Sequence, residues 1–211
     1  MERYLKKTIN TYDQIATDYV QTTDDLQPEK EFTTFSQMLV TGNTVLDAGC
    51  GGGRDCRALA ERGFRVIGID LSVEMLKIAK SMAPGCEFQH TDLRKIPLAD
   101  NSIDGIWCCA SLLHLKRKEV RHALLEFRRV LKKGAVCCIL IKKGTGEKFI
   151  KDSRSQGKPR FYSYFQPDEI RELCQSLAFE ILVGETTQSG SDAHREDWLY
   201  FLLRKPSSDL I

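Results

Sequence analysis

Apolar and polar positions alternate in a regular way through the middle of the chain. Short apolar runs, typical of buried strands, occur at 44–47, 64–69, 102–109 and 135–142, and a further strand is expected near 87–90. Amphipathic stretches with helical periodicity separate several of them, at 55–62, 72–81 and 118–131. Strands that alternate with helices indicate right-handed βαβ crossovers and a parallel sheet covered on both faces.

The two ends of the chain break this alternation. The first forty residues are polar with scattered aromatic side chains, and they predict two helices around Pro28. Toward the C-terminus the pattern predicts a helix at 167–178 and two strands at 179–184 and 198–204. A polar loop at 185–197 joins the two strands. So direct a connection suits an antiparallel hairpin that closes one edge of the sheet.

The segment 142–165 is the least regular part, and we interpret it as a loop or insertion beside the active face. It carries seven basic and two acidic residues and ends in the aromatic run 161–165. This combination suits an anionic or nucleic-acid substrate. The alternative is a solvated loop whose aromatic side chains pack against the sheet. Both tryptophans, Trp107 and Trp198, are expected in the core.

Length and charge narrow the class of protein. A chain of 211 residues fits one α/β domain, which we expect to span 1–211. The formal net charge of +2 creates no overall field that favours nucleic acid or a membrane. The start lacks the apolar stretch of a secretion signal, and the longest apolar run, 135–141, is too short for a bilayer. We therefore expect a cytoplasmic protein without membrane attachment.

The eight cysteines favour neither a disulfide framework nor a metal site. No C-x-x-C pair occurs, and the adjacent pairs 108–109 and 137–138 fall inside strand-like runs. Neighbouring residues of a strand point to opposite faces, so neither pair can easily chelate one ion. We expect no metal and interpret the cysteines as small buried side chains in a reducing compartment.

A glycine-rich turn follows the first predicted strand and is the first candidate ligand site. In open parallel sheets, ligands bind beyond the carboxyl ends of strands, where backbone must approach them closely. Gly49, Gly51 and Gly53 follow Asp47 in an acidic-x-G-x-G-x-G pattern. The dinucleotide pattern G-x-G-x-x-G fails at its third glycine, and the Gly-Lys-Ser/Thr of a phosphate-binding loop is absent.

Carboxylates at three consecutive strand ends favour a cationic nucleoside as the ligand. Asp47 would repel a phosphate but attract an amino group. Asp70 ends the second strand, where its carboxylate can accept both hydroxyls of a ribose. Asp92 follows the third strand and can accept the amino group of adenine, with Leu93 against the ring. Each taken alone fits an ordinary strand-end turn or helix cap, but together they suit S-adenosylmethionine, which carries an ammonium and a sulfonium.

The chain resembles the class I S-adenosylmethionine-dependent methyltransferases in four runs that occur in the expected order. They are VLDAGCGGGRD at 45–55, GFRVIGIDLS at 63–72, DLRKIPL at 92–98 and FRRVLKKG at 127–134. The similarity covers roughly residues 9–204. It implies a three-layer α/β/α sandwich whose seven-stranded, mostly parallel sheet has the order 3-2-1-4-5-7-6, with strand 7 antiparallel. The family often has two glycines before strand five, whereas here Ala135 follows Gly134.

The resemblance also implies roles for individual residues around the cofactor. Gly49, Cys50 and Gly51 would line its methionine part, and Asp70 would bind the ribose. The remaining implied contacts are Leu71 and Met75 near the ribose, Thr91, Asp92 and Leu93 around the adenine, and Ala110 beside the transferable methyl group.

Three side chains are candidates on the reacting side. His114, just past the fourth strand, is the best candidate for a general base, and the alternative is that it packs or hydrogen-bonds locally. Tyr12 and Tyr19 lie on one face of the first helix and suit a lid over the sulfonium, within a helical lid at 1–40. The alternative is an amphipathic helix packed on the sheet.

These observations predict an enzyme that transfers a methyl group from S-adenosylmethionine to an oxygen or nitrogen of a small molecule, leaving S-adenosylhomocysteine. One alternative is an RNA or tRNA methyltransferase that uses the segment 142–165. Another is a protein that binds S-adenosylmethionine without catalysis. No sequence feature specifies an oligomeric state.

Overall fold

One seven-stranded sheet organises the molecule. The computed structural model describes residues 1–40, 42–189 and 196–207. The strand order is β3-β2-β1-β4-β5-β9-β8, with the bounds β1 Thr44–Ala48, β2 Arg65–Asp70, β3 Glu87–His90, β4 Ile103–Cys109, β5 Leu131–Lys142, β8 Glu180–Ser189 and β9 Glu196–Arg204. The first five strands are parallel, and β9 runs antiparallel to β5 and β8. Because β8 and β9 are the sixth and seventh strands of this sheet, the predicted order is confirmed.

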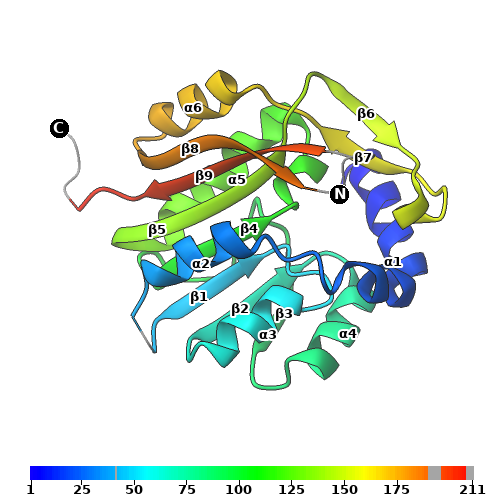
Figure 1. The fold of residues 1–211 in the computed structure, drawn as a ribbon, viewed down its shortest axis with the longest axis horizontal. Helices are drawn as coiled ribbons and strands as arrows, with labels where there is room; N and C mark the ends of the chain where they lie inside the picture. The colour runs from blue at the N-terminus through cyan, green and yellow to red at the C-terminus, as the bar shows by residue number, and fades with distance from the viewer. Residues whose placement is uncertain (41, 190–195, 208–211) are drawn as a thin grey trace.

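Helices cover both faces of the sheet, as a parallel sheet requires (Figure 1). One face packs against α2 (Glu29–Gln37), α3 (Arg54–Glu61) and α4 (Val73–Met82), and the other against α5 (Arg117–Val130) and α6 (Pro167–Ser176). The long α1 (Arg3–Thr23) packs instead against α4 and the outlying strand β7 (Arg160–Ser163). The helices predicted in the sequence are all present, with shifted ends.

Alternation along the central strands divides the core into two layers. On β5, Cys137, Ile139 and Ile141 face the α5 layer, whereas Cys138 and Leu140 face the α2 layer. The adjacent cysteines therefore point to opposite faces as predicted, and all eight cysteines have free thiols. No helix in the described ranges is both long and apolar enough to cross a membrane.

Two segments predicted as loops contain strands. The segment 142–165 forms an antiparallel hairpin of β6 (Glu147–Ile150) and β7, with a short 3-10 turn at Ser153–Ser155 between them. The predicted loop 185–197 is wrong at both ends because β8 continues to Ser189 and β9 starts at Glu196; its residues 190–195 lie outside the described part of the chain. The error at 185–197 arises because polar residues pair well in a strand that faces solvent on one side. Strand β7 is instead buried along its whole length, although it carries polar residues.

The third glycine of the turn has a packing role. Gly53 has a φ of +86° at the start of α3, and a Cβ atom there would lie 2.9 Å from the Ala79 Cα of α4. Only glycine adopts this backbone conformation without strain and leaves room for the neighbouring helix.

We therefore predict that Gly53→Ala lowers the free energy of unfolding by about 2 kcal/mol, because it adds both a strained φ and a backbone contact. Urea denaturation measures this change. Gly85→Ala is the matched control: no atom lies within 4 Å of its added Cβ and its φ is not left-handed. Equal midpoints for the two variants would contradict the assigned role of Gly53.

Candidate cofactor and acceptor site

A cavity of about 720 Å³ opens at the carboxyl ends of the parallel strands. Its volume lies within the range of small-molecule sites. All but two of the residues predicted from the sequence line it: Tyr12, Tyr19, Gly49, Cys50, Gly51, Asp70, Leu71, Met75, Thr91, Asp92, Leu93, Ala110 and His114. The fold thus brings predicted residues that are far apart in the sequence, from Tyr12 to His114, together in one cavity.

The glycine turn is held against the end of β2 by its own backbone. The amides of Gly49 and Cys50 both donate to the Ile69 carbonyl, at 2.8 and 3.0 Å. Gly49 has a φ of +86°, and a Cβ there would lie 1.9 Å from Ser111 Oγ. A side chain at position 49 would therefore push the turn away from the residue that follows β4.

Asp70 connects the turn to the helix after β2. Its Oδ2 accepts from the Gly51 amide at 2.9 Å, and its Oδ1 accepts from the Ser72 amide at 2.8 Å. Burial raises the pKa of Asp70, although these amides favour the carboxylate. A carboxylate can accept about four hydrogen bonds, so these amides do not use all of its acceptor positions.

Asp47 and Gly53 do not line the cavity. Asp47 is 2% exposed and accepts a hydrogen bond from Cys56 Sγ at 3.1 Å. Burial, with the nearby Asp55 carboxylate, raises the pKa of Asp47. A direct contact between Asp47 and an ammonium stays a prediction. Asp92 lines the cavity but is already ion-paired with Arg94 at 2.7 Å, which orients it.

His114 is held between two hydrogen bonds. Its Nδ1 lies 2.7 Å from the Phe161 carbonyl oxygen, and its Nε2 lies 2.8 Å from the Tyr12 hydroxyl. Since a carbonyl only accepts, Nδ1 carries the proton and Nε2 accepts from Tyr12. Burial lowers the pKa of His114 to about 3, so the ring is neutral at physiological pH. In this arrangement His114 positions Tyr12, and a direct role as a base stays a prediction.

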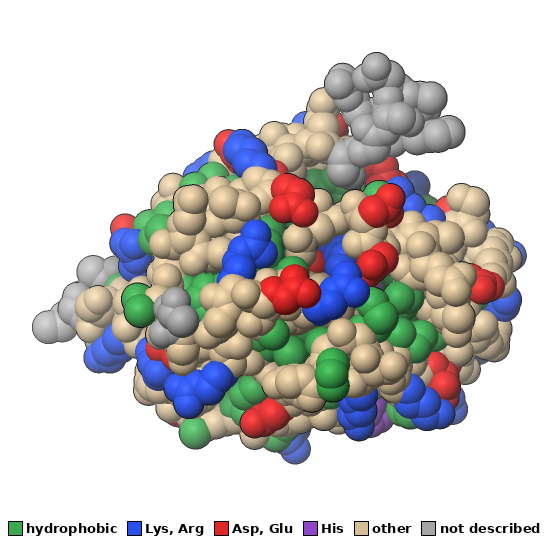
Figure 2. All heavy atoms as spheres, turned by 60° about the horizontal axis from the view of Figure 1, so that its bottom comes forward, with side chains coloured by type: hydrophobic (Ala, Val, Ile, Leu, Met, Phe, Trp, Pro, Cys, Tyr) green, Lys and Arg blue, Asp and Glu red, His purple; other side chains and the backbone are tan. Residues whose placement is uncertain are grey.

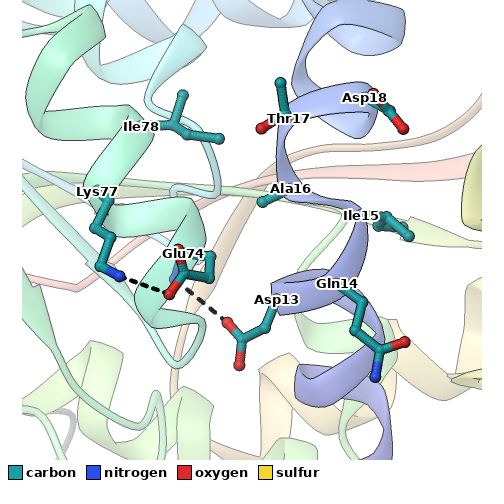
Figure 3. Close-up of a pocket in the computed structure, with 9 residues that line it drawn as sticks. All are labelled: Asp13, Gln14, Ile15, Ala16, Thr17, Asp18, Glu74, Lys77 and Ile78. Atoms are coloured by element: carbon teal, nitrogen blue, oxygen red, sulfur yellow. Dashed lines mark hydrogen bonds and ion pairs between the residues drawn. The ribbon is translucent and has the colours of Figure 1, made fainter.

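Helix α1 closes the cavity and is attached on both sides. Asp13 Oδ1 accepts from the Ser72 hydroxyl at 2.6 Å. It also accepts from the Glu74 amide at the start of α4 (Figure 3). On its other side, the Thr11 hydroxyl donates to the Pro159 carbonyl at 2.8 Å, beside β7. Tyr12 and Tyr19 contact each other edge-on, with ring centroids 5.2 Å apart. The helix predicted as a lid therefore bridges two parts of the chain.

Several residues of the cavity wall were not identified as site residues from the sequence. They include Arg54, Lys142, Arg154, Arg160, Tyr162 and Trp198. The basic and aromatic composition of 142–165 was a signal for four of them, but it did not show which side chains point inward. Trp198 was predicted in the core; it is only partly buried, and it lines the cavity.

Charge is mixed over the face of the molecule that Figure 2 draws. Figure 2 shows acidic and basic side chains next to one another across the face it draws, with apolar areas between them. Within the described ranges, no three His, Cys, Asp or Glu side chains form a group that could hold a metal ion.

The sheet order, the glycine turn and the carboxylate at the end of β2 define a class I S-adenosylmethionine-dependent methyltransferase fold. Comparison with known proteins agrees, because residues 46–139 match the family described as a methyltransferase domain. In its fold and in this matched domain, the chain is similar to the class I S-adenosylmethionine-dependent methyltransferases.

Two curated relatives and one solved structure illustrate the similarity. Demethylmenaquinone methyltransferase of Renibacterium salmoninarum is 36% identical over 95 residues, 45% of this chain and 39% of that protein. Malonyl-acyl-carrier protein O-methyltransferase of Hamiltonella defensa is 28% identical over 139 residues, 65% of this chain and 53% of the relative. The chain thus spans about half or less of these relatives.

The solved structure is that of Burkholderia thailandensis 1,6-didemethyltoxoflavin-N1-methyltransferase with bound 1,6-didemethyltoxoflavin and S-adenosylhomocysteine. It superposes with a TM-score of 0.69 at 20% identity, over 98% of this chain and 91% of that one. This likeness shows the shared fold.

The buried, neutral His114 makes stability depend on pH. Its pKa is lowered from 6.5 to about 3 in the folded state, so between these values the unfolded chain binds one more proton. Stability contributed by the neutral ring is present above pH 6.5 and is lost as pH falls toward 3, by up to about 1.4 kcal/mol per pH unit. We predict that His114→Gln flattens the fall in melting temperature between pH 6.5 and 4. Parallel profiles for the two proteins, recorded by calorimetry, would refute the assignment.

Proposed function

We propose that the protein transfers the methyl group of S-adenosylmethionine to an oxygen or nitrogen of a small-molecule acceptor. The observation that carries this proposal is that one cavity holds two unlike walls. Gly49, Gly51 and Asp70 form a wall suited to the cofactor, and Arg160 and Tyr162 belong to a wall of cationic and aromatic side chains. Helix α1 covers the space between them.

The residues present fit the cofactor. Asp70 keeps free acceptor positions, and no atom lies within 4 Å of a Cβ built on Gly51, so its backbone borders open space. When bound, S-adenosylmethionine supplies an activated methyl group on a good leaving group, so the protein mainly aligns the acceptor and excludes water. Tyr12, fixed by His114, lies on the wall of the same cavity.

A small acceptor is supported by the position of the basic residues in 142–165. Three of the seven basic residues of this segment, Lys142, Arg154 and Arg160, line the cavity and are paired with carboxylates. The Burkholderia structure with a bound small molecule agrees with this choice. RNA methylation stays the alternative. Affinity for RNA that falls steeply with rising salt concentration would support it.

The first test separates the cofactor from the acceptor. We predict that calorimetry detects binding of S-adenosylmethionine and S-adenosylhomocysteine, but not of NADPH. Labelled S-adenosylmethionine would then transfer its methyl group to a compound in a small-molecule extract, identified by mass spectrometry, and not to an RNA pool. Tight NADPH binding without S-adenosylmethionine binding would overturn the proposal, and label found only in RNA would favour the alternative.

Substitutions at His114 and Tyr12 test how the pair acts. With the acceptor identified by that assay, we predict that His114→Ala lowers kcat at least tenfold and leaves S-adenosylmethionine affinity unchanged. If His114 acts by holding Tyr12, Tyr12→Phe lowers kcat similarly and the double variant is no worse than either one. Unchanged turnover in His114→Ala would remove this residue from the mechanism.

A further inference from the structure

The wall formed by β7 and the ends of β5 and β9 contains hydrogen-bond donors without acceptors. Arg160 Nε and Trp198 Nε1 are buried and have no partner among the described residues. Both side chains line the cavity. Donors left unpaired in a buried position are unfavourable, so a ligand that accepts hydrogen bonds would stabilise this wall.

The guanidinium of Arg160 is held in place by hydrogen bonds at Nη1 and Nη2, and its Nε has no partner among the described residues. Arg160 is only 1% exposed. Its Nη2 donates to both carboxylate oxygens of Asp152, at 2.9 and 2.8 Å. Its Nη1 donates to the Tyr12 hydroxyl at 3.0 Å. A guanidinium has five N–H donors, so these contacts fix its orientation without using all of them.

Lys142 extends the same donor group. Its Nζ lies 5.1 Å from the ring centroid of Trp198 and 5.8 Å from that of Tyr162. The Arg160 guanidinium lies 5.4 Å from the same Tyr162 ring. Lys142 is ion-paired with Glu196, but an ammonium has three donors. The Tyr162 ring therefore lies close to both cations, and the Trp198 ring lies close to Lys142.

The charges of the two walls differ. Among the described cavity residues and their ion-pair partners here, Lys142, Arg154 and Arg160 outnumber the carboxylates Asp152 and Glu196 by one charge. The segment 24–31, which also lines the cavity, has four acidic residues and one lysine. An anion would be repelled by that segment and attracted to the Arg160 wall.

We propose that Arg160, Lys142 and Trp198 Nε1 form a subsite for an oxyanion of the methyl acceptor, a carboxylate or a phosphate. This inference rests on the proposed function, because it names the chemistry of the acceptor in the same cavity. An oxyanion offers several lone pairs to donors on one cavity wall, and charge-assisted hydrogen bonds are the strong ones. The flanking rings of Tyr162 and Trp198 suit an acceptor with a flat apolar body.

Three aromatic probes of similar size test the subsite. The protein loaded with S-adenosylhomocysteine is titrated calorimetrically with benzoate, phenyl phosphate and the neutral benzamide. We expect at least one anion to bind ten times more tightly than benzamide, and the tighter one identifies the carboxylate or phosphate class. Equal affinities for all three probes would overturn the proposal. The titrations are repeated without the cofactor, so that failure of S-adenosylhomocysteine to bind counts against the proposed function alone.

Variants locate the subsite. Trp198→Phe keeps an aromatic ring and removes the N–H, and we expect it to weaken binding of the preferred anion about fivefold. Arg160→Gln should abolish the preference for anions over benzamide, and thermal melts show whether this variant is folded. Lys142→Met tests the same wall without disturbing Asp152. Arg121→Gln removes the same charge from an exposed position on α5 and should change nothing. An anion preference that persists in Trp198→Phe, Lys142→Met and a folded Arg160→Gln would refute the subsite.

Discussion

The carboxylate of Asp70 is the interaction on which the cofactor half of the site depends. It accepts the amides of Gly51 and Ser72, and so joins the glycine turn after β1 to the start of α4. The turn itself has little to hold it, because glycines lack side chains and its backbone is left-handed at three positions. Hydrogen bonds to the end of β2 therefore define its shape, and the open backbone that borders the cavity follows from that shape.

Helix α1 adds the second constraint, since it closes a cavity that the sheet alone would leave open. Its attachment to α4 uses Asp13, and its attachment to the β6–β7 hairpin uses Thr8 and Thr11, with the Thr8 hydroxyl accepting from the Phe161 amide at 2.9 Å. Tyr12 lies between these two attachments and meets both His114 and Arg160. The position of Tyr12 in the cavity therefore depends on the hairpin as much as on the helix that carries it.

Most of the sheet and the cofactor wall could be predicted from the sequence because both are local. Apolar runs set the strands, and ligand residues follow directly from strand ends, as Asp70 and Asp92 do. Asp47 shows the limit of this reasoning: its place at a strand end was correct, but its side chain turns to Cys56 and away from the cavity. The side on which a residue next to a turn points depends on packing that sequence spacing does not report.

The residues of the proposed acceptor wall could not be predicted from the sequence, for a different reason. Lys142, Arg160 and Trp198 come from β5, β7 and β9, and only the hairpin and the antiparallel pairing of β9 with β5 bring them together. No spacing along the chain marks such a group, and the composition of 142–165 fits an exposed nucleic-acid surface equally well. We favour the acceptor site because Arg160, Lys142 and Trp198 line the cavity. In the proposed complex, Asp70 and the glycine turn would hold the cofactor, and Arg160 would hold the anion of the acceptor. The neutral Tyr12–His114 pair lines the same cavity between these two walls in our proposal.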